Sequence, residues 1–134
     1  MGLFYLSTPE HGWIDITFVD QSKSFSFCAS DVPNDCLRDL VVAVTLLKKG
    51  SPSETVEFSL EPDFMLCELL RDADQLSIRL RLSDQSEFAF AGTLSFASFV
   101  DEICAELERI KPVYDSENSW TQPYPEVHIA KLRG

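Results

Sequence analysis

Histidine and glycine are scarce in this sequence, and their scarcity excludes several common kinds of site. Only His11 and His128 are present, and the four cysteines form no Cys-x-x-Cys pair, so the spacing of a zinc site is absent. The five glycines are isolated from one another, which excludes a Gly-rich phosphate loop and a Gly-x-Ser-x-Gly nucleophile elbow. The sequence therefore predicts no catalytic residue, no metal site and no cofactor, and we expect a protein that is not an enzyme.

Positive charge is also scarce. Eleven Lys and Arg residues stand against twenty-two Asp and Glu residues, which gives a net charge of −11. Such a chain is repelled by phosphate backbones and by anionic membranes, so we expect neither nucleic acid nor membrane as a partner. The same charge would steer a basic protein partner toward the chain. A second interpretation stays open, in which the acidic surface serves only solubility.

The four cysteines are expected to be free thiols. Cys28, Cys67 and Cys104 lie in apolar stretches, and Cys36 lies at the start of a predicted helix. This placement is typical of buried thiols in a reducing compartment, which predicts a cytoplasmic protein. The apolar run at residues 1–7 has no preceding positive charge and is too short for a signal peptide. No apolar stretch approaches the length of a membrane span.

Length and composition predict one domain over residues 1–134. A chain of this size buries about two-thirds of its unfolded surface. Hydrophobic residues make up 45% of the chain and include ten Phe, so a core can form without a disulfide or a metal.

Alternating apolar and polar residues predict most of the strands. The alternation covers residues 13–19, 23–28, 54–60 and 76–82. Residues 64–71 are apolar at both odd and even positions, a pattern that fits either a helix or a strand. Their position just before 76–82 favours a strand that forms a hairpin with that segment. Residues 87–94 complete a set of about six strands. Polar turns are expected at 20–22 and 115–119.

Two helices and a short terminal element are also predicted. Asp31 is the expected cap of the first helix, whose apolar stripe runs from Leu37 to Leu47. Ser95 is the expected start of the second helix, and Pro112 its expected end. Pro125 is expected to open a short C-terminal element. The order is strand-strand-helix-strand-strand-strand-strand-helix, which predicts a two-layer α+β fold with an antiparallel sheet and both helices on one face.

The other face of this sheet is expected to face solvent. On the predicted parities it carries Asp15, Thr17, Ser24, Ser26, Glu57, Ser59, Arg79 and Arg81. Glu102 and Glu106, one helical turn apart, resemble the carboxylates of a metal site, but no Glu-x-x-His partner accompanies them. A solvated helix face is therefore the favoured interpretation for that pair.

Arg79 and Arg81 share one face of a predicted strand in a very acidic chain. Cross-strand pairing with Glu57, Glu68 or Asp15 would explain them structurally, and we favour this interpretation. The alternative is an anchor for an acidic or carboxylate-bearing partner, because Arg is enriched in interface hot spots.

Trp120 and Tyr124 lie in a proline-bearing segment near the C-terminus. They either fold back over the edge of the core or present an aromatic surface to a partner. The first interpretation is favoured, because an exposed aromatic patch reduces solubility. The candidate interface residues are Asp15, Glu57, Arg79, Arg81, Trp120 and Tyr124.

The whole pattern resembles a family of small bacterial α+β proteins. It is carried by the hairpin Ile14–Cys28, the helix Leu37–Leu47, the charged strand pair Met65–Leu82 and the segment Trp120–Pro125. Some small acidic proteins of this kind resemble immunity proteins of bacterial polymorphic toxin systems. The resemblance implies a protein that binds and neutralises a basic partner, and it assigns a role to no residue.

Two other hypotheses stay open. A site for a small molecule, or an enzyme site, assembled from distant residues would draw on Cys28, His11, Arg79 or Trp120. A self-associating subunit would pair edge strands such as 23–28 or 87–91 across a two-fold axis.

Overall fold

The computed structural model describes residues 3–21, 23–114 and 119–134. Position 22 of the first predicted turn and positions 115–118 of the predicted polar loop lie outside these ranges. The strands are β1 (Phe4–Leu6), β2 (Trp13–Asp20), β3 (Lys23–Ser30), β4 (Ser53–Ser59), β5 (Phe64–Asp72), β6 (Gln75–Leu82) and β7 (Phe90–Ser95). The helices are α1 (Cys36–Lys48), α2 (Phe96–Tyr114) and α3 (Glu126–Arg133).

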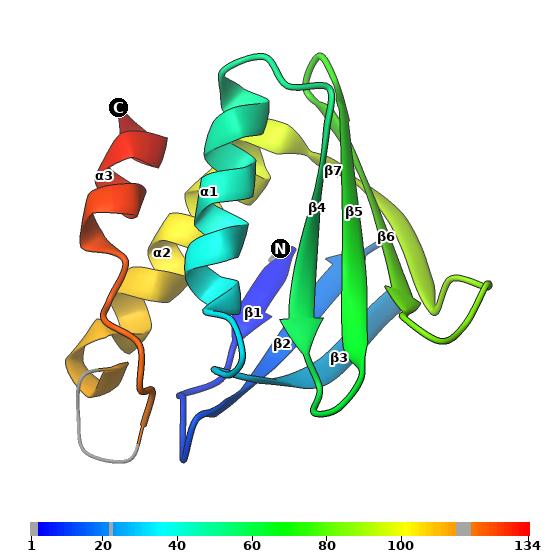
Figure 1. Ribbon diagram of the computed structural model, residues 1–134. Coiled ribbons are helices and arrows are strands. Elements are labelled where there is room, and N and C mark those ends of the chain that lie inside the picture. The colour runs from blue at the N-terminus through cyan, green and yellow to red at the C-terminus, as the bar shows by residue number, and fades with distance from the viewer. Residues whose placement is uncertain (1–2, 22, 115–118) are drawn as a thin grey trace.

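The α+β class and the antiparallel sheet are confirmed. Over the described ranges the strands form one sheet in the order β1 to β7, with every neighbouring pair antiparallel. The sheet has one strand more than the sequence indicates, because Phe4–Leu6 pairs with Ile16–Phe18. Helix α1 packs against β4 and α2 packs against β1 and β7, whereas α3 lies on the far side of α1 from the strands (Figure 1).

The sheet is nearly split between β3 and β4. These two strands share a single paired position, Ser30 with Ser59, whereas β2 pairs with β3 and β5 with β6 along their whole lengths. Figure 1 shows β1–β3 crossing at a large angle to β4–β6. The sheet therefore consists of two halves that fold toward each other over a common core.

Phenylalanine side chains join the two halves. Phe27 of β3 meets Phe58 of β4 edge to face, with ring centroids 5.2 Å apart, and Phe25 stacks on Phe90 of β7 at 6.2 Å. Phe4 contacts Phe18 and Phe99, which ties β1 and β2 to α2. Edge-to-face and offset stacked pairs stabilise a core beyond the burial of their area.

Both outer edges of the sheet are occupied by side chains. On the β1 edge, Glu102 accepts hydrogen bonds from the backbone N–H groups of Leu3 and Phe4, and Glu106 accepts one from Leu6. On the β7 edge, Asp20 accepts a hydrogen bond from the N–H of Thr93, and Lys23 donates to the carbonyl of Ala91. Glu102 and Glu106 are thus edge caps rather than a solvated helix face, and the interpretation from sequence was wrong on this point.

Three local predictions also need correction. The cap of α1 is Asp35, whose carboxylate accepts from the Arg38 N–H, while Asp31 turns away toward Thr121. Helix α2 continues through Pro112 to Tyr114, because the buried Tyr114 ring packs against Trp120 and Tyr124 and holds the last turn. Ser59 is buried rather than solvated, since it is the position of β4 that the crossing strand β3 covers.

Candidate protein-binding site

The edge of β4 that faces away from β5 is open along much of its length. The N–H of Arg71 donates to the carbonyl of Pro52, and the N–H of Leu60 donates to the carbonyl of Asp63. The backbone N–H and C=O groups of successive residues point to opposite edges of a strand. Those of the even-numbered residues of β4 therefore point toward β5, and those of the odd-numbered residues point toward the open edge. The N–H and C=O of Thr55 and the N–H of Glu57 have no hydrogen-bond partner in the described part of the chain.

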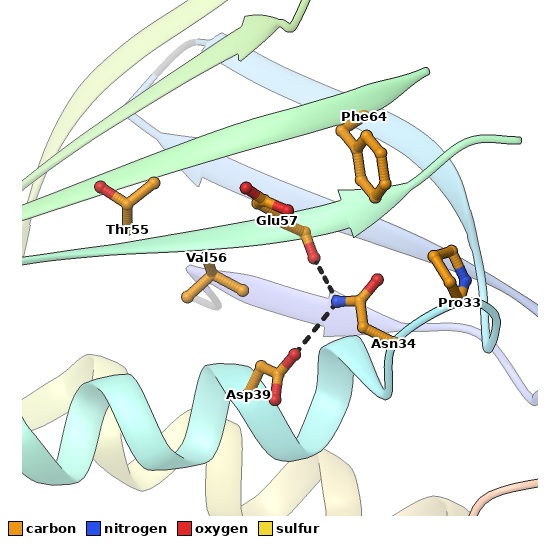
Figure 2. A pocket seen from close by; sticks show the side chains of 7 residues that line it. All are labelled: Pro33, Asn34, Asp39, Thr55, Val56, Glu57 and Phe64. Atoms are coloured by element: carbon orange, nitrogen blue, oxygen red, sulfur yellow. Dashed lines mark hydrogen bonds between the residues drawn. The ribbon is translucent and has the colours of Figure 1, made fainter. Parts of the chain in front are cut away.

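A groove of about 420 Å³ lies along this open edge. One wall is the edge itself, and the other is the start of α1 with the loop before it, as Figure 2 shows. The lining residues are Pro33, Asn34, Asp39, Thr55, Val56, Glu57 and Phe64. The groove forms because the chain turns from β3 into α1 after Ser30, so no strand continues alongside Thr55 and Glu57.

Asn34 joins the two walls of the groove. Its Nδ2 donates to the carbonyl of Glu57 at 2.8 Å and to the Asp39 carboxylate at 3.0 Å (Figure 2). Its Oδ1 is buried and has no hydrogen-bond partner among the residues described. A buried acceptor without a donor is costly, and the N–H groups of Thr55 and Glu57 beside it are two unused donors on the edge of the groove.

The outer face of the β4–β7 strands combines apolar and charged side chains. Cross-strand pairing sets Glu57 beside Leu66 and Leu66 beside Arg81, and it sets Glu68 opposite Arg79. Leu66 and Leu70 are half-buried, and Phe88 in the following loop is 43% exposed. This face, together with the groove at its β4 edge, is the candidate binding site.

The four Lys and Arg residues on the β3, β5 and β6 strands contact uncharged groups. Arg71 lies 4.0 Å from the ring centroid of Phe96 and donates to the carbonyls of Leu47 and Ala73. Arg79 lies over the Phe88 ring at 5.7 Å, Arg81 donates to the carbonyl of Gln85, and Lys23 donates to that of Ala91. Arg79 lies directly opposite Glu68, as the favoured interpretation expects, but in the described residues no ion pair joins Arg79 or Arg81 to Glu57, Glu68 or Asp15.

Many carboxylates of the sheet and its turns consequently form no ion pair with Lys or Arg. The ion pairs that Lys or Arg forms in the described ranges all involve helical residues: Asp39 of α1, Glu106 and Glu108 of α2, and Glu126 of α3. The carboxylates without such a partner on the strands and their turns include Asp15, Glu54, Glu57, Glu61, Asp63, Glu68, Asp72, Asp84 and Glu87. The excess negative charge therefore resides on the sheet side of the molecule.

The structure brings three of the six candidate interface residues together. Glu57, Arg79 and Arg81 share the outer face of the β4–β7 strands. Asp15 is exposed on β2, in the other half of the sheet. Trp120 is buried, and its Nε1 donates to Asp35 at 3.4 Å. Tyr124 is half-buried against Tyr114, and both aromatic residues lie on the core as the favoured interpretation expects.

Asp15 and Cys28 occupy a separate shallow pocket of about 270 Å³ with His11 and Trp13. Cys28 is exposed, which contradicts the expectation of four buried thiols, while the other three are buried. Its position on the outward parity of β3 explains the exposure. Partial desolvation of the thiol, with the hydrogen bond and charge of Asp15, raises the pKa of Cys28, which opposes formation of a nucleophilic thiolate.

Sequence reasoning missed the groove and its central residue, Asn34. The pairing of Asn34 with Glu57 spans 23 positions and depends on the chain leaving the sheet after Ser30. No group of three or more metal-ligating side chains occurs in residues 3–21, 23–114 and 119–134. Within the same ranges, no helix has the length and hydropathy needed to cross a membrane.

Comparison with protein-family models, with curated proteins and with solved structures finds no match for this chain.

Proposed function

We propose that this protein is a non-enzymatic binding domain that docks a basic protein partner on the outer face of its β4–β7 strands. The observation that carries the proposal is the excess of carboxylates over Lys and Arg on the strands of the sheet and their turns. Carboxylates such as Glu57 and Glu68 have no ion pair in the described part, although Arg79 and Arg81 lie on neighbouring positions of the same face. A complementary basic surface would supply the missing partners and accelerate association.

The centre of this face supports the same function. Leu66 and Leu70 are half-buried apolar residues on either side of Glu68 along β5, and Arg79, opposite Glu68, lies over the Phe88 ring. Protein interfaces commonly combine apolar contacts with charged and polar ones. Arg and aromatic residues are also enriched among the residues that dominate binding energy.

Within this class, we propose an immunity or inhibitor role, in which the domain covers a basic site of a toxin-like partner. Acidic inhibitors match basic active sites through charge, and they need no catalytic group of their own. The cytoplasm is the proposed compartment, and the free thiols of Cys36, Cys67 and Cys104 in the core support it.

The test is affinity capture from the source cell with two matched variants. The first variant, Glu57→Gln/Glu68→Gln/Asp84→Asn, removes three charges from the sheet side. The second, Asp101→Asn/Glu108→Gln/Glu126→Gln, removes three charges from the α2–α3 side. Both have the same net charge, so a difference between them reports the position of the charge rather than its amount.

A stoichiometric basic partner should be retained by wild type and by the α2–α3 variant. The sheet variant should lose most of it, and high salt should weaken it in all three because charge pairs are screened. Equal retention by both variants would place the interface elsewhere, and capture of no partner at low salt would refute the proposed function.

A further inference from the structure

We propose that the open edge of β4 accepts an extended, basic segment of the partner as an added strand. This inference rests on the proposed function and specifies how the partner is held. Its basis is the juxtaposition of unpaired backbone groups at Thr55 and Glu57 with the acidic walls of the groove beside them.

The edge has the hydrogen-bond pattern that strand addition requires. Thr55 offers a donor and an acceptor, and Glu57 offers a donor, all toward the groove. Successive outward residues of a strand repeat this pattern, so an extended peptide can pair with it through main-chain bonds.

The charges of the groove select the class of occupant. Glu57 is exposed on the outer side of the edge, and Asp39 stands across the groove on α1 (Figure 2). Alternate side chains of an added strand point to opposite faces, so Lys or Arg residues of one parity meet Glu57 and those of the other parity approach Asp39. Arg38 already contacts Asp39 at 3.2 Å, so Glu57 is the stronger determinant of the two.

A second copy of this chain is a poor occupant. It would bring a net charge of −11 to an acidic groove, and like charges oppose association. The outer edges of β1 and β7 are already covered by side chains. The outward groups of β3 at Ser24, Ser26 and Cys28 are the remaining open edge in the described residues, and they provide the matched control.

The experiment measures binding of a fluorescent peptide of alternating Arg and Thr residues to the full chain by anisotropy at low salt. Thr55→Pro removes one unpaired N–H from the groove and leaves the β4–β5 ladder intact, because Thr55 faces away from β5. Thr55→Val changes the side chain and keeps that N–H. Ser26→Pro removes the corresponding N–H from the open edge of β3.

Thr55→Pro should weaken peptide binding at least about tenfold, because a main-chain bond is lost and the ring obstructs the edge. Thr55→Val and Ser26→Pro should remain within about twofold of wild type, since neither alters the β4 backbone donors. Glu57→Gln should weaken binding and reduce its dependence on salt. If Thr55→Pro binds as wild type does, or if Ser26→Pro is the variant that loses binding, the inference is wrong.

If Thr55→Pro fails to fold, amide hydrogen exchange of the wild-type protein provides a second test of strand addition. The Thr55 and Glu57 amides should exchange rapidly in the free protein and become protected when the peptide is present. The Val56 amide, which faces β5, should be protected in both states. Unchanged exchange at Thr55 and Glu57 with peptide bound would overturn strand addition. The proposed function would survive that result, because the affinity capture tests the charged face without reference to the β4 backbone.

Discussion

The carboxylate of Asp31 accepts hydrogen bonds from both the backbone N–H and the hydroxyl of Thr121, at 2.7 and 2.6 Å, across 90 positions of sequence. Asp31 is 4% exposed, and its own N–H donates to the carbonyl of Gly12. A side chain on Gly12 would meet the Asp31 carboxylate at 2.9 Å, and the φ of Gly12 is +80°. The end of β3, the turn before β2 and the segment before α3 are thus fixed around one buried carboxylate.

Asp31→Ala should destabilise the protein by about 1–3 kcal/mol, because two hydrogen bonds from Thr121 to the buried carboxylate are lost. Urea unfolding followed by circular dichroism measures this loss. Asp101→Ala, a change at an exposed carboxylate of α2, should cost less than about 0.5 kcal/mol. Equal stability of the two variants would show that the Thr121 contacts contribute little.

The carboxylates of Glu102 and Glu106 should protect the protein from association through β1. Glu102→Ala/Glu106→Ala frees the N–H groups of Leu3, Phe4 and Leu6, and an open strand edge is a template for pairing. We expect light scattering at micromolar concentration to detect oligomers of this variant. Asp101→Ala/Glu108→Ala removes the same charge from the same helix and should remain as monomeric as wild type.

The protection of β1 should also fail in acid. Burial raises the pKa of Glu106, but hydrogen bonds from Arg109 and the Leu6 N–H outweigh it, so the pKa is lower than usual. A lowered folded-state pKa stabilises the fold above the unfolded carboxyl pKa, and this contribution is lost as the pH falls through the folded pKa. A pH titration should therefore show wild type becoming association-prone in acid, with the Glu106→Gln variant showing a smaller change over the same range.

Asp35→Asn should maintain or raise stability at neutral pH. Burial raises the pKa of Asp35 despite its hydrogen bonds from Arg38 and Trp120. With a raised folded-state pKa, the ionised form destabilises the fold at neutral pH, and this cost disappears as the pH falls below the unfolded-state pKa. Asn caps helices about as well as Asp. Unfolding midpoints of the two proteins should thus converge in acid, and a variant that is less stable by a constant amount at every pH would contradict the argument.

The local alternation of apolar and polar residues is sufficient to predict most of the strands. Residues 76–82 alternate strictly, and the structure places Leu76, Ile78 and Leu80 in the core with Arg79 outside. By contrast, Phe4–Leu6 is too short to show a period, and its strand state depends on pairing with β2. Such distant pairing is invisible to a periodicity argument.

The candidate site illustrates the same limit. The sequence indicates an acidic protein, and it places Glu57, Arg79 and Arg81 on one face. It does not indicate that Arg79 contacts the Phe88 ring, or that Arg81 binds a carbonyl, so that the carboxylates beside them remain unpaired. The groove at Asn34 depends on β3 and β4 sharing one paired position, which is a property of the assembled sheet.

In the native protein, Cys28 should be the first thiol to react with an aromatic disulfide reagent such as dithiobis(nitrobenzoate). It is exposed, whereas Cys36, Cys67 and Cys104 are buried. Partial desolvation, with the hydrogen bond and charge of Asp15 directly opposite on β2, raises the pKa of Cys28, so its thiolate fraction at neutral pH is low and the reaction should be slow. Asp15→Asn removes the charge and should accelerate the reaction of this thiol severalfold at pH 7.5, by lowering its pKa toward the ordinary value. Cys28→Ser, as the control, should abolish the first reactive phase and leave the others to appear only on unfolding. An unchanged rate in Asp15→Asn would mean that the carboxylate does not control the thiol, and that limited access at the strand surface is the cause of its slow reaction.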